Sequence, residues 1–139
     1  MDALRLPGRV ESLAAIGTYI VQVAAEAGLG EQAAYGLRLA VDEIATNAVV
    51  HGYQEAGGSG ELVVKAEQTV DRLTVVLEDT SPPYDPRLTP PPDILDHEPV
   101  VRPSGGLGVY LARQGVDAYR YDFIDGTNRH TFMMNRTQY

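Results

Sequence analysis

The sequence predicts an α/β fold, a two-layer sandwich with a mixed, mostly antiparallel sheet covered on one face by helices. Two segments with helical apolar periodicity open the chain, two pairs of short β-rich segments follow, and a tight polar turn joins each pair. About four strands with helices enough for one face make two layers. The 139 residues are short enough for a single domain, expected over residues 1–139.

Two amphipathic helices are expected first. Apolar residues recur at three-and-four spacing from Val10 to Ala27, and "AGLGE" ends that pattern. A second helix is expected from about Glu31 to His51. At 100° per residue, Glu43 and Asn47 lie one turn apart at the edge of its apolar stripe, pointing towards whatever covers it. The stripe consists of Leu37, Ala40, Val41, Ile44 and Ala48.

Two β-hairpins are expected next. "ELVVKAEQT" (61–69) and "RLTVVLED" (72–79) read as strands joined at Val70–Asp71, and "DAYRYDFI" (117–124) and "NRHTFMMNR" (128–136) flank the turn "DGT". One face of the sheet is expected to be solvated or engaged in association. Its outward candidates are Lys65, Glu67, Arg120 and Asp122.

A proline-rich segment separates the hairpins. Residues 80–104 carry eight of the nine prolines and no sustained period, which predicts a long loop with at most a helical turn near Asp93 to Asp96. The following "GGLGVYLARQGV" (105–116) opens with glycines and reads as a short amphipathic helix. A compact domain seldom keeps so long a loop without using it.

Composition excludes several classes of function. A net charge of -8 with scattered basic residues argues against direct, sequence-independent nucleic-acid binding, and the lack of cysteine excludes disulfides and thiolate chemistry. No apolar run is long enough to span a membrane, so a cytoplasmic protein is expected. The three histidines, at 51, 97 and 130, lack ligand spacing, and the eight tyrosines are expected in packing or on the surface.

Four signals with chemical potential fall in a fixed order. Glu43 and Asn47 lie on a helix, Asp79 ends a strand, "GGLG" opens a helix, and "DGT" lies in the last hairpin. A glycine-rich helix start presents backbone N–H groups and the positive end of the helix dipole to a phosphate. The side-chain oxygen of Asn47 suits Mg²⁺, which prefers oxygen ligands. The order of these four signals along the chain is more informative than any single one of them.

These motifs resemble a known family. "DEIATNAVVHGY", "EDTSPPYDP", "GGLGVYLAR" and "DGTNRHTF" are similar to the successive boxes of the anti-sigma-factor serine/threonine kinases, within the gyrase, histidine kinase and MutL (GHKL) ATPase superfamily. The resemblance covers nearly the whole chain. It implies a Bergerat-type ATP-binding sandwich with ATP and Mg²⁺ as cofactors.

The resemblance also implies roles for individual residues. Asn47 would hold Mg²⁺, and Glu43 would be the general base that accepts the proton of a serine or threonine hydroxyl. Asp79 would accept a hydrogen bond from the adenine amino group. The phosphates would be wrapped by Gly105, Gly106, Leu107 and Gly108, with the proline-rich segment as an ATP lid. Arg102 is the nearest cation that could reach a phosphate, and Thr127 would support the adenine pocket.

One box departs from the family pattern. The family reads Asp-x-Gly where this chain has Asp79-Thr80-Ser81. The glycine lets the backbone turn closely beneath the adenine, whereas Ser81 adds a side chain and disfavours a positive φ. Weakened or altered nucleotide binding is therefore expected, with Asp79 itself retained.

The implied partners are proteins. They are a sigma factor, which the chain would sequester, and a STAS-type anti-sigma factor antagonist, whose serine or threonine it would phosphorylate; the chain would form a homodimer. The rival interpretation is a binding module that clamps ATP, or binds none, and sequesters a regulator without kinase activity. Ser81 favours this rival, whereas Glu43 with Asn47 argues against it. A histidine kinase fragment is not expected, since no helix with a phosphoacceptor histidine precedes the domain.

Overall fold

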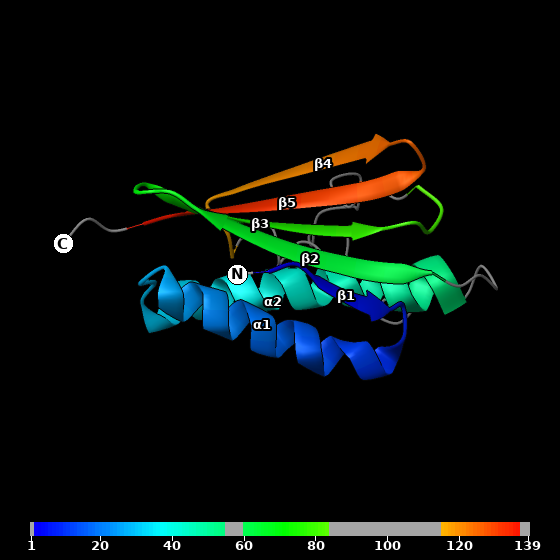
Figure 1. The fold of residues 1–139 in the computed structure, drawn as a ribbon, viewed down its shortest axis with the longest axis horizontal. Helices are drawn as coiled ribbons and strands as arrows, with labels where there is room; N and C mark the ends of the chain where they lie inside the picture. Colours follow the sequence, from blue (N-terminus) through cyan, green and yellow to red (C-terminus); the bar gives the residue numbers. More distant parts are fainter. Residues whose placement is uncertain (1, 55–59, 84–114, 137–139) are drawn as a thin grey trace, which may run out of the picture.

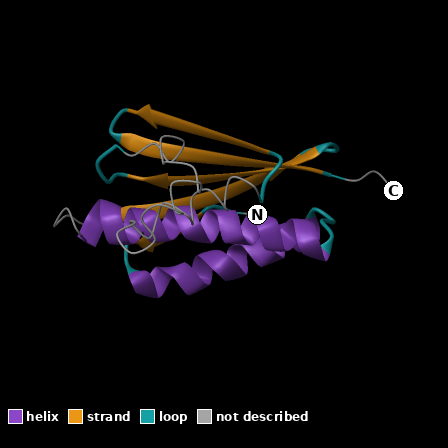
Figure 2. Ribbon diagram, turned by 180° about the vertical axis from the view of Figure 1, so that it is seen from behind, coloured by secondary structure: helices purple, strands orange, loops and turns teal. Residues whose placement is uncertain are grey.

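A layer of two helices packs on one face of a five-stranded sheet in the computed structural model, which describes residues 2–54, 60–83 and 115–136 (Figure 1). Figure 2 shows the same two layers from behind. The predicted α/β sandwich is confirmed. The elements are β1 (Leu4–Pro7), the 3-10 turn η1 (Val10–Ser12), α1 (Leu13–Glu26), α2 (Glu31–Asn47), the π-helix η2 (Ala48–Gln54), β2 (Glu61–Gln68), β3 (Arg72–Asp79), β4 (Ala118–Ile124) and β5 (Thr127–Asn135).

The sheet has the strand order β1-β2-β3-β5-β4. All four pairings among the described strands are antiparallel, so the mixed pairing that was expected is not found in this part of the chain. β5 lies between β3 and β4, and Asp79 at the end of β3 is directly opposite Asn128 near the start of β5. This register brings the end of β3 and the start of β5 together at one end of the central strands.

The core lies between the sheet and the helices. Both helices bury one apolar side, as the three-and-four spacing predicted, and burying each large aliphatic or aromatic side chain contributes about 1.5–3 kcal/mol. The alternation of β3 and β5 places every second residue in the same core. Fully buried members are Ile16, Ile20, Leu37, Val41, Val49, Leu62, Val64, Leu73, Val75, Leu77 and Phe132.

Two parts of the fold differ from the sequence prediction. β1 was not predicted, and it adds a fifth strand at the sheet edge, where Leu4 and Leu6 oppose Val64 and Leu62. The second helix does not end at His51, since the α-helix stops at Asn47 and the backbone continues as the wider η2. π-Helical segments inside helices often occur at functional sites. Most of the proline-rich loop and the helix predicted after it lie outside the described residues.

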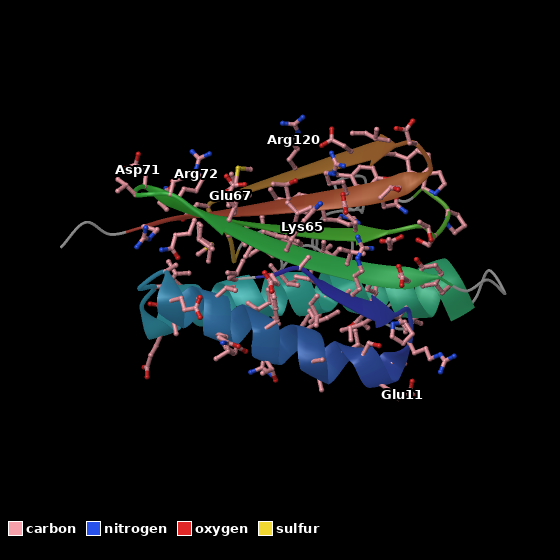
Figure 3. The ribbon with its side chains drawn as sticks, in the orientation of Figure 1. Glu11, Lys65, Glu67, Asp71, Arg72 and Arg120 are labelled. Carbon is pink, nitrogen blue, oxygen red and sulfur yellow. The ribbon has the colours of Figure 1, made fainter. Side chains whose placement is uncertain are left out.

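The face of the sheet away from the helices carries charge, as predicted (Figure 3). Lys65, Glu67 and Arg120 are exposed there. Glu78 lies among cations, with Lys65 Nζ 3.4 Å from Oε1 and Arg129 Nε 2.8 Å from Oε2. Burial raises the pKa of Glu78, but the hydrogen bonds and charges of Arg129 and Lys65 outweigh it, so the net pKa is lowered. The fourth outward candidate, Asp122, is half-buried and pairs with Arg120 at 3.0 Å.

Within the described ranges, none of the helices combines the length and the apolar character that crossing a bilayer requires.

Two glycines let α2 approach the segment that leads into β4. A Cβ on Gly36 would lie 2.6 Å from the carbonyl oxygen of Gly115, and a Cβ on Gly115 would lie 2.7 Å from that of Gly36. Both obstacles are backbone atoms, which cannot rotate away. Contact between these two backbones therefore fixes where β4 starts relative to α2.

Replacing Gly36 by alanine is expected to lower the free energy of unfolding by about 1–3 kcal/mol, because the new methyl group forces the two backbones apart. Gly17→Ala is the matched control, since the added Cβ there meets only the flexible Arg38 side chain, at 3.4 Å or more. Alanine is the better helix former by about 1 kcal/mol, so the control should be neutral or stabilising. Urea denaturation measures both changes, and equal shifts in the two variants would contradict the close contact.

Candidate functional site

A pocket of about 180 Å³ opens where α2 passes into η2, beside the ends of β3 and β5. Its lining mixes an apolar wall with polar side chains that converge from four segments, which is the usual character of a ligand site. The lining residues are Ile44, Asn47, Ala48, Gly52, Asp79, Ser81, Pro82, Pro83, Asn128 and His130.

Asn47 is the last residue of α2 and points into the core side of the helix. It is only 6% exposed, and its Nδ2 has no hydrogen-bond partner among the described residues. A buried amide left without a partner costs about 1–3 kcal/mol. Because Asn47 lines the pocket, a ligand that enters there can supply the missing partner. The amide can offer either its N–H to a phosphate oxygen or its oxygen to a cation.

Asp79 is the centre of a buried hydrogen-bond network. Its Oδ1 accepts from the backbone N–H of Ser81 at 2.9 Å, from the Ser81 hydroxyl at 2.5 Å and from Asn128 Nδ2 at 2.9 Å. Asn128 Nδ2 also donates to the Ser81 carbonyl oxygen at 2.9 Å, and the Tyr121 hydroxyl donates to Asn128 Oδ1. These bonds hold the carboxylate in one orientation, with Asp79 only 3% exposed.

Ser81 does not adopt a positive φ. The only described non-glycine residue with a positive φ is Asp125, so the backbone at Ser81 avoids the left-handed region that serine disfavours. The weakened or altered nucleotide binding expected from Ser81 stays a prediction. The Ser81 side chain instead bonds Asp79 and takes up space next to η2, where a Cβ on Gly52 would lie 2.5 Å from its Oγ.

Hydrogen bonds of Tyr53 link η2 to the end of β3. Its hydroxyl accepts the Thr80 N–H at 2.8 Å and donates to the Glu61 carbonyl oxygen at 2.9 Å. Tyr53 is 3% exposed, so these bonds lie in the interior. The widened backbone of η2 thereby helps fix the segment that carries Asp79 and Ser81.

The predicted site residues divide into three groups. Asn47, Asp79 and Ser81 come together in the pocket. Glu43 lies one turn before Asn47 and is half-buried, and Thr127 opens β5; neither is among the lining residues. The remaining predicted residues, Arg102, Gly105, Gly106, Leu107 and Gly108, lie outside the described residues. The roles of all of them stay predictions.

Sequence reasoning missed two polar residues of the pocket, Asn128 and His130. Both lie on the buried side of β5, in phase with Phe132 and Met134. The signal was available, because polar side chains at alternate positions of a strand that otherwise buries apolar residues need partners. Their role depended on knowing that β5 pairs with β3.

Asp42, next to the predicted base, has a different environment. Its carboxylate pairs with Arg38 Nε at 3.5 Å, one turn earlier on α2. Burial raises the pKa of Asp42, against the opposing effect of Arg38. Asp42 is thus bound to its own helix and does not line the pocket.

A Mg²⁺ ion fits the pocket only as part of a larger ligand. Among the described residues, no group of three or more histidine, aspartate or glutamate side chains is arranged to hold a metal. Mg²⁺ keeps several waters and accepts oxygens from one or two side chains together with substrate phosphates. Asn47 lines the pocket and carries an amide oxygen, the atom that Mg²⁺ would take, while its unpartnered Nδ2–H suits an acceptor such as a phosphate oxygen.

Comparison with known proteins identifies the family of this chain. The model of the histidine kinase-like ATPase domain matches residues 6–134. The chain belongs to this family. The match extends from Leu6 in β1 to Met134 in β5, so it includes every described element of this ATPase-type domain that lines the pocket.

Relatives of this ATPase-type domain carry a more specific name. The serine-protein kinase RsbW of Bacillus licheniformis is 28% identical over 137 residues, covering 96% of this chain and 85% of the relative. RsbW of Bacillus pumilus is 29% identical over 138 residues with the same coverage, and RsbW of Staphylococcus aureus is 28% identical over 118 residues, covering 82% and 74%. The domain is therefore a distant relative of these kinases over most of its length.

Proposed function

We propose that this chain is an anti-sigma regulatory factor that binds ATP with Mg²⁺ and phosphorylates a serine or threonine of an anti-sigma factor antagonist. The observation that carries the proposal is the pairing of a buried, unpartnered Asn47 amide with the Asp79 carboxylate in one pocket. Family membership and the serine-protein kinase relatives support it. A homodimer and a sequestered sigma factor belong to the same proposal.

Different pocket residues would bind different parts of ATP. Asp79 would accept a hydrogen bond from the adenine amino group, while Ser81 and Asn128 keep its carboxylate oriented. Asn47 would hold Mg²⁺ at the phosphate end. The predicted Gly105, Gly106 and Gly108 would contribute backbone N–H groups to the phosphates.

ATP would supply the phosphoryl group. Glu43 would accept the proton of the acceptor hydroxyl, as a general base one turn from Asn47 on α2. Glu43 lies beside the pocket and not within it. This position suits a general base, because the acceptor hydroxyl arrives from solvent. The half-buried position of Glu43 supports this role.

The charge of the chain supports the proposed switch. It carries a net charge of -8, and phosphorylation adds about -1.5 to -2 to the antagonist. The modified antagonist would be repelled from so acidic a partner. Phosphate transfer would therefore release the antagonist and leave the chain able to hold its sigma factor.

A second candidate function is a binding module without kinase activity, and Ser81 is the observation that favours it. Its hydroxyl donates to Asp79 Oδ1 within the space beside Gly52, so part of the pocket is filled by the protein itself. In that case the domain would sequester a regulator with weak ATP binding or none.

Calorimetric titration of ATP with Mg²⁺ into the full chain tests the proposal against this rival. Wild type should bind, and Asn47→Ala should bind about 10–100-fold more weakly, because a charge-assisted contact is lost. Asn135→Ala, at an exposed position at the end of β5, is the control that should match wild type. No binding at millimolar ATP would contradict the kinase and leave the sequestering module. Equal affinity of wild type and Asn47→Ala would contradict the role of Asn47.

A further inference from the structure

The hydrogen-bond ladder between β2 and β3 has a defined phase. The two strands are antiparallel, and the opposed pair just beyond the end of β3 is Glu61 with Thr80. At the hairpin end, the Thr69 N–H donates to the Arg72 carbonyl oxygen at 2.8 Å. Bonded pairs recur at every second position of such a ladder, so Glu61 with Thr80 is in phase with that bonded pair. A bond from the Thr80 N–H to the Glu61 carbonyl oxygen would therefore continue the ladder.

The Tyr53 hydroxyl takes the place of this bond. It accepts the Thr80 N–H at 2.8 Å and donates to the Glu61 carbonyl oxygen at 2.9 Å. Its oxygen also lies 3.2 Å from Thr80 Oγ1, which uses the second acceptor position of a hydroxyl. A side chain from η2 is thus inserted between the two groups that the ladder would otherwise join directly.

Two glycines provide the space for the Tyr53 ring. A Cβ on Gly8 would lie 2.4 Å from the ring atom Cε2, and a Cβ on Gly60 would lie 2.7 Å from the hydroxyl oxygen. The Gly8 N–H donates to the Gly60 carbonyl oxygen at 2.8 Å, so the two glycines are themselves held together. Tyr53 is buried. The ends of β1, β2 and β3 therefore fix the ring and its hydroxyl in one place.

The chain turns immediately after the inserted hydroxyl. Asp79 is the last residue of β3, and the Ser81 N–H donates back to Asp79 Oδ1 at 2.9 Å. A bond from an aspartate side chain to the backbone two residues on is an Asx turn, which bends the chain at the residue between them. That residue is Thr80, whose N–H is bonded to the hydroxyl in place of the neighbouring strand. The inserted hydroxyl and the turn that orients Asp79 therefore meet at one peptide group.

We propose that Tyr53 is a positioning residue of the nucleotide site, whose hydroxyl, inserted between β2 and β3, bends the chain at Thr80 and so sets the orientation of the Asp79 carboxylate. The inference rests on the proposed function, in which this carboxylate accepts from the adenine amino group. Tyr53 is not among the described lining residues, so it would act on the base through Asp79. A carboxylate oriented before the ligand arrives lowers the cost of binding. Loss of the hydroxyl should therefore weaken recognition of adenine in particular.

Calorimetry of Tyr53→Phe with Mg²⁺ on the full chain tests this effect. The variant keeps the ring and removes only the hydroxyl. It should bind ATP about tenfold more weakly than wild type, since Asp79 is no longer held in one orientation. Inosine triphosphate, which lacks the amino group, should lose little affinity. Tyr19→Phe is the matched control that should behave like wild type, because it removes the hydroxyl of a buried tyrosine on α1 that is not among the described lining residues.

NMR of the free wild-type chain tests the insertion itself without a variant. A direct hydrogen bond between backbone groups gives a measurable coupling from the amide nitrogen to the accepting carbonyl carbon. Thr69 and Arg72 should show this coupling, because they bond directly. Thr80 and Glu61 should not show it, because the Tyr53 hydroxyl lies between them. A coupling from Thr80 to Glu61 would overturn the inference.

The outcomes separate this inference from the proposed function. If wild type binds ATP and Tyr53→Phe loses affinity for both nucleotides equally, positioning of Asp79 is overturned while ATP binding stands. A lower melting temperature of Tyr53→Phe with unchanged ATP affinity also overturns the inference alone, since the tyrosine would then only stabilise the fold. If wild type binds no ATP at millimolar concentration, the proposed function is overturned and the inference with it.

Discussion

Glu43→Gln is expected to lower phosphate transfer by about 10²–10⁴-fold, because glutamine keeps the shape of the side chain and cannot accept a proton. ATP affinity should change little, since Glu43 is not among the described lining residues. Transfer of label from γ-labelled ATP to the antagonist measures the first quantity, and calorimetry measures the second. A loss of transfer without a loss of binding is what a general base predicts.

Asp42→Asn is the matched control for Glu43→Gln. Asp42 is the adjacent carboxylate on α2, is also half-buried, and pairs with Arg38. Its removal should leave phosphate transfer within a few-fold of wild type. Transfer at the wild-type rate by Glu43→Gln would contradict the base role. If Asp42→Asn alone lost transfer, that role would belong to Asp42.

Asp79→Asn is expected to weaken ATP binding by about 10–100-fold, because it replaces an acceptor with a donor at Oδ2. The amide oxygen can keep the three bonds that Ser81 and Asn128 give to Oδ1, so the fold should be retained. The new Nδ2 would face the adenine amino group, donor against donor. Inosine triphosphate, which has a carbonyl oxygen in that place, should lose less affinity. Calorimetry with both nucleotides measures the change in preference.

Asp122→Asn controls for the loss of a negative charge. Asp122 lies on β4 and pairs with Arg120 at 3.0 Å, away from the pocket. It should bind ATP like wild type. If Asp79→Asn also bound ATP like wild type while its melting temperature fell, the Asp79 carboxylate would be a structural group and not a reader of the base.

Local patterns predicted most of the fold because each element buries one regular face. The stripe that includes Leu37 and Val41 and the alternation of β3 both follow from period alone. β1 could not be predicted in this way, since four residues carry little periodic signal and the strand depends on pairing with β2. The change from α2 to η2 likewise depends on contacts such as those of Tyr53 with Glu61 and Thr80.

The pocket was predictable in part for a related reason. Asn47 lies on a helix whose buried face can be read from the sequence, and Asp79 ends a clear strand. Asn128 and His130 join them only through the pairing of β5 with β3, which sets Asp79 opposite Asn128. Pairing between segments 49 residues apart in the chain, as for the Asp79–Asn128 bond, is a tertiary property that local periodicity does not contain.

The most direct measurement is a titration of the isotope-labelled full chain with ATP and Mg²⁺, followed residue by residue by ¹H–¹⁵N NMR. The expected result is saturable shifts centred on Asn47, Asp79, Ser81, Asn128 and His130, with Lys65 and Glu67 on the other face of the sheet unchanged. No shifts at millimolar ATP, or shifts centred on Lys65 and Glu67, would contradict a nucleotide site at the junction of α2, β3 and β5.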